Sequence, residues 1–276
     1  MSFDLRKQND LLWLSSSLLE KDGLCHGFST RKGGVSPAPW DSLNLRPGQG
    51  DGQEALLENY RRFFGVCNAD WQRAVLSKQV HETTVRLCTA ADAGKGLFAP
   101  RDYTADALIT NEPNLPLVVF SADCGIILLY DPVQNAIGAI HAGWRGCAAG
   151  IVEKTVQAMT AAFSSRPRDL LAAIGPCIGQ CCFETDDDVP SAMTAALGDA
   201  AAPFLERRGA KWHVDLAGLN RQWLLRAGLS HSNIDLCGLC TTCRPDLFWS
   251  HRKTGDARGA QIAMICLSPT AKGGVR

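Results

Sequence analysis

Short apolar runs alternate with longer amphipathic segments along most of the chain. Runs rich in β-branched residues predict strands at residues 105–110, 117–120, 126–130, 136–140, 170–174, 234–243 and 261–267, and residues 73–87 fit a strand, a break and a strand. Helical spacing covers residues 53–64, 148–163, 187–205 and 215–227. This interleaving predicts a mixed α/β fold class in which mixed β-sheets are flanked by helices.

The apolar runs on either side of an Asp-Pro turn predict a β-hairpin with a reactive side chain near each end. If the turn closes on Asp131 and Gln134, Cys124 lies directly opposite His141, with Cβ atoms about 5 Å apart. A left-handed Asn135 would add a bulge, shift the register by one and turn His141 to the other face. Both faces of both strands are apolar, so the pattern leaves the two registers open.

Length, charge and cysteine content limit the number of domains, the partners and the location that we expect for the protein. The chain has 276 residues and no stretch that resembles a linker, so we expect one domain over residues 1–276. Basic and acidic residues number 28 each, which provides no net field for nucleic acid or an anionic membrane. No run has the length of a membrane span, and residues 1–23 lack the features of a signal peptide. Twelve cysteines without an export signal predict reduced thiols and a cytoplasmic location.

The paired Cys124 and His141 indicate either half of a metal site or a nucleophile with its base. With His81 they would give a metal one thiolate and two imidazoles, and three protein ligands are typical of catalytic zinc. Spacing connects Cys124 with His141, but it provides no reason to add His81.

Two basic positions are candidates for anion binding. Arg31 lies in a Gly-rich loop after a predicted strand, and Arg145 lies in a Gly-bracketed turn before a predicted helix. Each also fits a solvated or ion-paired surface residue, so both interpretations stay open.

A second group of thiols follows the pattern Cys237-x2-Cys240-x2-Cys243. It lacks a fourth nearby ligand for a metal cluster, and a zinc site would have to take one from the Cys-rich residues 177–182. Simple buried cysteines are the favoured interpretation. We therefore expect Cys237, Cys240 and Cys243 to be dispensable for activity.

Three familiar motifs are missing from the sequence. The zinc nucleobase deaminases need His-x-Glu and a later Pro-Cys-x-x-Cys, and neither is present. No P-loop and no G-x-G-x-x-G fingerprint occurs either.

A set of blocks spread over residues 26–267 resembles one known family. The family was once described as polyphenol oxidases or laccase-domain proteins and is now described as purine nucleoside phosphorylases with accompanying adenosine deaminase activity. The blocks are HGFSTRKGGVS, DSLNL, KQVH, ADALIT, SADCGIILLYD, IHAGWRG, AAIGPCIGQCCFE and FWSHRKTG. The resemblance implies that His81, Cys124 and His141 bind zinc and act in catalysis through it.

The resemblance also implies a fold similar to that of a bacterial toxin deamidase with a Cys–His site. It implies small-molecule substrates, namely phosphate and a purine nucleoside such as adenosine, inosine, guanosine or S-methyl-5'-thioadenosine. Phosphorolysis needs an anion site, for which Lys78, Arg31 and Arg145 are the candidates. No nucleic acid or membrane partner is expected, and the oligomeric state is left open.

Three other classes of function are weighed against this one. A His2Cys site also suits copper, but a laccase needs a His-rich trinuclear cluster and the chain has only six histidines. A metal-free hydrolase would use Cys124 as nucleophile and His141 as base. A non-catalytic binding protein would show no turnover.

Overall fold

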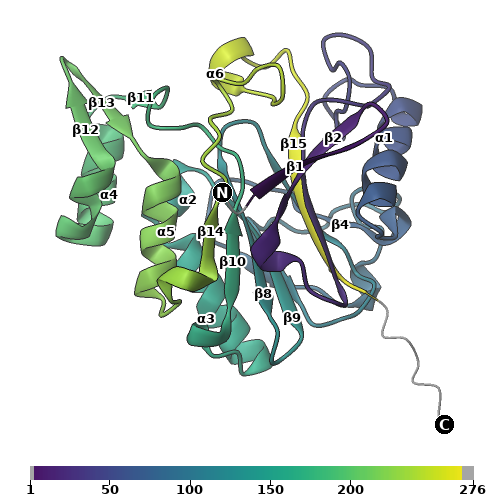
Figure 1. Ribbon diagram of the computed structural model, residues 1–276, viewed down its shortest axis with the longest axis horizontal. Helices are drawn as coiled ribbons and strands as arrows, with labels where there is room; N and C mark the ends of the chain where they lie inside the picture. Colours follow the sequence, from purple (N-terminus) through teal and green to yellow (C-terminus); the bar gives the residue numbers. More distant parts are fainter. Residues whose placement is uncertain (1–2, 269–276) are drawn as a thin grey trace.

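In the computed structural model, which describes residues 3–268, the strands form two six-stranded sheets and one three-stranded sheet (Figure 1). The first sheet has the order β1-β2-β3-β15-β7-β4, formed by Phe3–Gln8, Leu11–Ser16, Leu24–Ser29, Gln261–Leu267, Leu117–Ser121 and Val75–Leu76. The second sheet has the order β14-β10-β8-β9-β6-β5, formed by Ile234–Leu236, Leu171–Ile174, Gly125–Asp131, Ala136–Ala142, Ala107–Thr110 and Val85–Leu87. The small sheet has the order β11-β13-β12, formed by Glu184–Thr185, Lys211–Val214 and Leu205–Arg208.

Helices cover the outer faces of the two large sheets. The α-helices of the described residues are α1 Gln53–Val66, α2 Trp144–Ala148, α3 Ile151–Phe163, α4 Asp188–Leu197, α5 Leu216–Arg226 and α6 His251–Thr254. None of these helices has the length and apolarity needed to cross a membrane. The expected fold class, mixed α/β with helices flanking mixed sheets, is confirmed.

The alternation of side chains along the central strands builds layers. In β8, Ile126 and Leu128 pack with Ile265 of β15 in a buried cluster between the two large sheets. Their neighbours Ile127 and Leu129 face the opposite way, into the cluster formed with α3 and α5. A third cluster joins α1 to the outer face of the first sheet. Because both faces of β8 are buried, its sequence is apolar throughout.

The hairpin of β8 and β9 has neither of the two registers that the sequence left open. Asp131 pairs with Ala136, so the turn is four residues long, and Asn135 is left-handed with φ of 50°. The Asp131 carboxylate accepts hydrogen bonds from the amides of Val133 and Gln134, which stabilises this wider turn.

This register places His141 opposite Ile126, two positions from the predicted partner. A shift of two keeps the same face of the sheet, whereas a shift of one would have inverted it. The expectation that Cys124 lies directly opposite His141 is wrong, but Cys124, the residue directly before β8, is two positions from Ile126 and remains a diagonal neighbour of His141.

Several predicted elements differ in extent. The helix expected at residues 148–163 is α3, which begins only at Ile151 because Gly150 adopts φ of 75°. The turn expected before it contains the short helix α2. The strand expected at residues 234–243 ends at Leu236, and residues 198–204 form a 3-10 helix after α4. The β1–β2 hairpin and the small sheet lack a strong apolar period and were not predicted.

Candidate active site

A cavity of about 680 Å³ opens where loops of the two large sheets meet. Its lining includes the ends of β7 and β9, the segments that follow β4 and precede β8, and the loop of residues 46–49. The helix α6 and the loop after it also contribute. Polar residues of the lining include Arg46, Lys78, Gln79, His81, Arg101, Ser121, Asp123, Cys124, His141, His251, Arg252 and Arg258.

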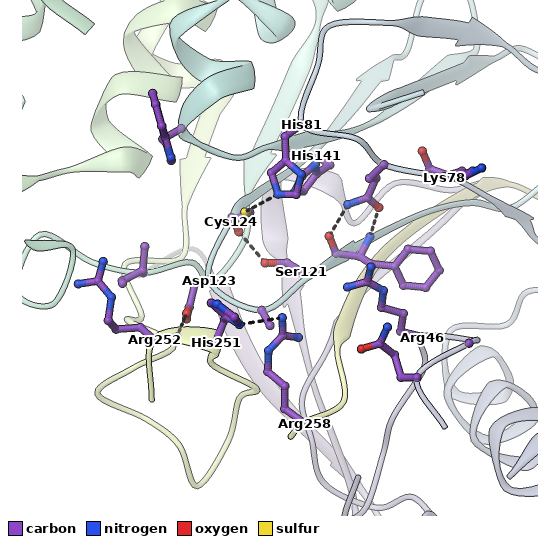
Figure 2. Close-up of a pocket in the computed structure, with 18 of the residues that line it drawn as sticks. Arg46, Lys78, His81, Ser121, Asp123, Cys124, His141, His251, Arg252 and Arg258 are labelled. Carbon is purple, nitrogen blue, oxygen red and sulfur yellow. Dashed lines mark hydrogen bonds between the residues drawn. The ribbon is translucent and has the colours of Figure 1, made fainter. Parts of the chain in front are cut away.

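His81, Cys124 and His141 bring their donor atoms together at this cavity (Figure 2). The ring nitrogens and the sulfur all lie within 4.8 Å of one another, and Cys124 Sγ is 3.8 Å from His81 Nε2. The two imidazole rings meet edge to face, with their centroids 4.8 Å apart. One thiolate and two imidazoles at such separations suit a single zinc ion, whose ligand bonds are about 2.0–2.3 Å long.

Asp106 contacts both histidines and was not predicted from the sequence. The residue is fully buried before β6, and its Oδ1 lies 2.8 Å from His141 Nδ1. The same carboxylate accepts hydrogen bonds from the backbone amides of Val80, His81 and Glu82. It therefore fixes the loop that carries His81, whose φ is 64°, and leaves Nε2 of His141 to face a metal.

The Cys124 thiol ionises easily in this setting. Burial alone would raise its pKa, but the charge on His141 and hydrogen bonds from His141 and His81 outweigh burial and lower it to about 6. For His141 the directions are reversed. Burial alone would lower its pKa, but Cys124 and Asp106 raise it to about 9. Without a metal, a thiolate and an imidazolium are therefore the stable pair near neutral pH.

Arginines give the cavity a positive charge. Arg46 and Arg258 point their guanidinium groups toward its middle (Figure 2). Burial lowers the pKa of both, and repulsion adds to this, from Arg101 on Arg46 and from Arg46 on Arg258. Arg101 and Arg258 donate hydrogen bonds to backbone carbonyls, and in the described part of the chain no carboxylate forms an ion pair with Arg46. Such an arrangement suits an anion.

The three basic residues predicted to bind phosphate are in different places. Lys78 lines the cavity. Arg31 donates hydrogen bonds to the carbonyls of Asp41 and Pro245 and stacks on Trp249, 4.1 Å from the ring centroid.

Arg145 is exposed within α2, not in the turn before a helix, and its guanidinium lies over the Trp144 ring. Neither Arg31 nor Arg145 lines the cavity, so their role in phosphate binding stays a prediction.

A second group of ligand atoms lies beside this site. We call it the four-cysteine cluster; its members are Cys181, Cys182, Cys240 and Cys243. Their sulfur atoms all lie within 4.8 Å of one another, so the group could bind a metal. Further ligands are present, because two members come from residues 177–182, as a zinc site would require, and Cys237 takes no part. Of the three thiols interpreted as simple buried cysteines, Cys237 is buried and Cys243 is exposed.

Comparison with known proteins gives a consistent result over almost the whole chain. Residues 25–268 match the family model described as multi-copper polyphenol oxidoreductase laccase. The purine nucleoside phosphorylase YlmD of Bacillus subtilis is 34% identical over 258 residues, which cover 92% of this chain and 91% of that protein. The purine nucleoside phosphorylase YfiH of Escherichia coli is 36% identical over 231 residues, covering 84% of this chain and 89% of that protein.

Solved structures show the same fold. The crystal structure of YlmD from Geobacillus stearothermophilus superposes with a TM-score of 0.88 at 31% identity, covering 96% of this chain and 99% of that one. Human LACC1, also described as a purine nucleoside phosphorylase, is 31% identical over 93% of this chain and 58% of its own length. The chain therefore belongs to the YlmD, YfiH and LACC1 family, the family that the laccase model describes.

Proposed function

We propose that the protein is a zinc-dependent purine nucleoside phosphorylase that also deaminates adenosine. The observation that supports this most strongly is one cavity in which a Cys/His donor set lies beside arginines that form no ion pair with a carboxylate of residues 3–268. The relatives YlmD and YfiH, described as purine nucleoside phosphorylases, support the same substrate class. Adenosine, inosine, guanosine and S-methyl-5'-thioadenosine are the expected nucleosides.

His81, Cys124 and His141 would hold the zinc ion. When bound, the ion would supply Lewis acidity and would lower the pKa of a coordinated water, which deamination requires. Asp106 keeps the proton on Nδ1 of His141 and holds the His81 loop in place. A cysteine that binds zinc must be a thiolate. Because the pKa of Cys124 is low, deprotonating its thiol at neutral pH costs little free energy.

Phosphate would bind to the cationic side of the cavity. Lys78, Arg46 and Arg258 line it, and charge-assisted hydrogen bonds from guanidinium groups are strong and directional. An arriving dianion would relieve the mutual repulsion of the arginines. Phosphate held there would be positioned to attack the sugar carbon as the purine base leaves.

The test is a phosphate-dependent assay on purified protein with measured zinc content. With phosphate present, adenosine should yield adenine and ribose 1-phosphate. Without phosphate, adenosine should be deaminated to inosine. Cys124→Ala and His81→Ala should abolish both reactions and the zinc ion bound in the cavity, while Cys25→Ala, a cysteine outside the cavity, should retain both. Zinc-free protein with full turnover would overturn the proposal.

The anion site is tested by separate variants. Arg258→Ala and Arg46→Ala should raise the KM for phosphate at least about tenfold, a loss of about 1.4 kcal/mol in transition-state binding. Deamination should change less, because it uses no phosphate. A larger rise in the KM for phosphate in Arg145→Ala or Arg31→Ala would show that phosphate binds at the positions predicted from the sequence instead.

A metal-free Cys–His hydrolase is the second candidate, because Cys124 and His141 form an ionised pair in the absence of metal. Such an enzyme would be active after chelation and would be inactivated by alkylation of Cys124. A copper oxidase has less support. Within residues 3–268 the groups able to hold a metal contain no histidines besides His81 and His141.

A further inference from the structure

We propose that the four-cysteine cluster is a tetrathiolate site for a structural zinc ion, separate from the ion in the cavity. The sulfur of Cys243 lies 3.5 Å from that of Cys181 and 3.4 Å from that of Cys182. Four sulfur atoms bound tetrahedrally to zinc at about 2.3 Å lie about 3.8 Å apart. The observed separations are close to this value and far longer than a disulfide bond of about 2.05 Å.

The topology of the second sheet explains why these thiols meet. Strands β10 and β14 are parallel neighbours, so the loops that follow them leave the sheet at the same edge. The first loop carries Cys181 and Cys182, and the second carries Cys240 and Cys243. A β-bridge between Cys177 and Cys240 and the hydrogen bond from the Thr241 amide to the Cys177 carbonyl hold the loops side by side.

A backbone donor already faces one of the sulfur atoms. The amide of Gly179 donates a hydrogen bond of 3.2 Å to Cys240 Sγ, a contact that stabilises a thiolate. A Cβ at Gly179 would lie 3.1 Å from that of Cys240 and 3.3 Å from Cys181 Sγ, so a larger residue would crowd the cluster. Cys181 and Cys243 are exposed, which gives an ion access from solvent.

The site would connect the two loops to the cavity. Arg252, which lines the cavity, donates hydrogen bonds to the carbonyls of Cys182 and Glu184. Its amide donates to Asp123, and the same carboxylate accepts a hydrogen bond from Thr241, next to Cys240. Because Asp123 precedes Cys124, a zinc ion in the cluster would fix the positions of both Arg252 and the start of β8.

Metal stoichiometry tests the proposal directly. Wild-type protein should bind two zinc ions, and the double variant Cys181→Ser/Cys243→Ser should bind one. A Cys124→Ala/His141→Ala variant, which removes the cavity site, should keep one ion and give an intense thiolate charge-transfer band when loaded with cobalt. Cys237→Ser is the matched control, since the sequence spacing includes it and the cluster does not; it should retain both ions.

Alkylation of the wild type keeps the test valid if the double variant fails to fold. Iodoacetamide followed by peptide mass spectrometry should find the cluster protected in zinc-loaded protein and at least tenfold more reactive after chelation. Equal reactivity in both samples, a disulfide between Cys181 and Cys243 in protein purified in air, or iron in place of zinc would overturn the proposal. Wild-type protein that binds zinc in the four-cysteine cluster but not in the cavity would contradict the proposed function and would support the cluster site.

Discussion

At the scale of single residues, Asp106 determines the arrangement of both histidine ligands. It binds three successive amides of the His81 loop and the Nδ1 atom of His141, with no exposure to solvent. A buried carboxylate costs free energy unless it is hydrogen-bonded, and here these bonds keep its pKa below the usual range although burial opposes this.

Asp106→Asn should therefore weaken zinc binding by about 10–100-fold, because the amide can no longer accept every hydrogen bond that holds the two histidines. Competition with a chromogenic chelator measures the affinity. Asp92→Asn is the control, since Asp92 is equally buried but accepts its hydrogen bonds from Thr89 and Arg86, away from the cavity. Unchanged zinc affinity in Asp106→Asn would show that the carboxylate has no such role.

The lowered pKa of Cys124 predicts a pH profile for the metal-free protein. The thiolate, which is the reactive form, should increase as pH rises through about 6, so alkylation of Cys124 should rise there and level off by pH 8. In His141→Ala the rise should move to higher pH, because the main lowering influence is gone. Peptide mass spectrometry follows Cys124 beside Cys147, whose pKa is raised by burial and which should stay inert. Profiles that coincide in the two proteins would refute the coupling.

The sequence identifies some site residues and misses others for a physical reason. Cys124 and His141 lie on one hairpin, so local pairing brings them together even though the predicted register was wrong by two. His81 and Asp106 lie before β5 and β6, and they reach the site because β5 pairs with β6 and β6 pairs with β9, contacts between segments distant in sequence. An Asp within the apolar strand predicted at residues 105–110 was the one available signal for Asp106.

At the scale of elements, the turn from β9 into α2 passes very close to the ligands. A Cβ at Gly143 would lie 3.0 Å from Cys124 Sγ and 3.1 Å from His81 Cδ2, although its φ of −64° suits any residue. The glycine is therefore required for space and not for backbone conformation. The same turn leads into α2, a helix of five residues.

Gly143→Ala should lower zinc affinity at least about tenfold, or about 1.4 kcal/mol, with little change in folding stability. Gly65→Ala is the matched control, because a Cβ at Gly65 in α1 meets nothing within 4 Å. It should raise stability by about 0.5 kcal/mol through helix propensity and leave zinc binding unchanged. Chemical denaturation and zinc competition on both variants decide the matter. Equal zinc affinity in the two variants would contradict the claim that a Cβ at position 143 crowds the zinc ligands.

Elements with a strong period were predictable, and those that depend on distant partners were not. The helix α1 begins at Gln53 as expected, because its apolar residues repeat at helical spacing. The parallel pairing of β10 with β14 is invisible to any local pattern, because 59 residues lie between Ile174, where β10 ends, and Ile234, where β14 begins. For that reason the sequence could name residues 177–182 only as a possible source of a further ligand, and it did not favour the four-cysteine cluster.

At the scale of the whole molecule, the two large sheets share one buried cluster. Leu128 of β8 and Ile265 of β15 both belong to it and are fully buried. Each sheet therefore loses apolar contacts if the other unfolds, which favours a single cooperative transition. This expectation extends the prediction of one domain over residues 1–276.

Equilibrium unfolding of the zinc-loaded protein should give coincident transitions by circular dichroism and tryptophan fluorescence. Leu128→Ala should lower the free energy of unfolding by about 2–5 kcal/mol and shift both probes together, because it opens a cavity between the sheets. Leu87→Ala, at a side chain 51% exposed, should change it by less than about 0.5 kcal/mol. Two separated transitions, with one unaffected by Leu128→Ala, would divide the chain into independent units.

The place of β15 in the first sheet has a consequence for the order of events during synthesis. This strand, residues 261–267, is among the last described parts of the chain to leave the ribosome, yet it lies between β3 and β7. Until it emerges, β3 and β7 have no common partner, and β7 leads directly into the segment that carries Cys124. A nascent chain thus contains His81, Cys124 and His141 long before it has the sheet that positions them. The cavity that these residues line can therefore form only after β15 has been synthesised.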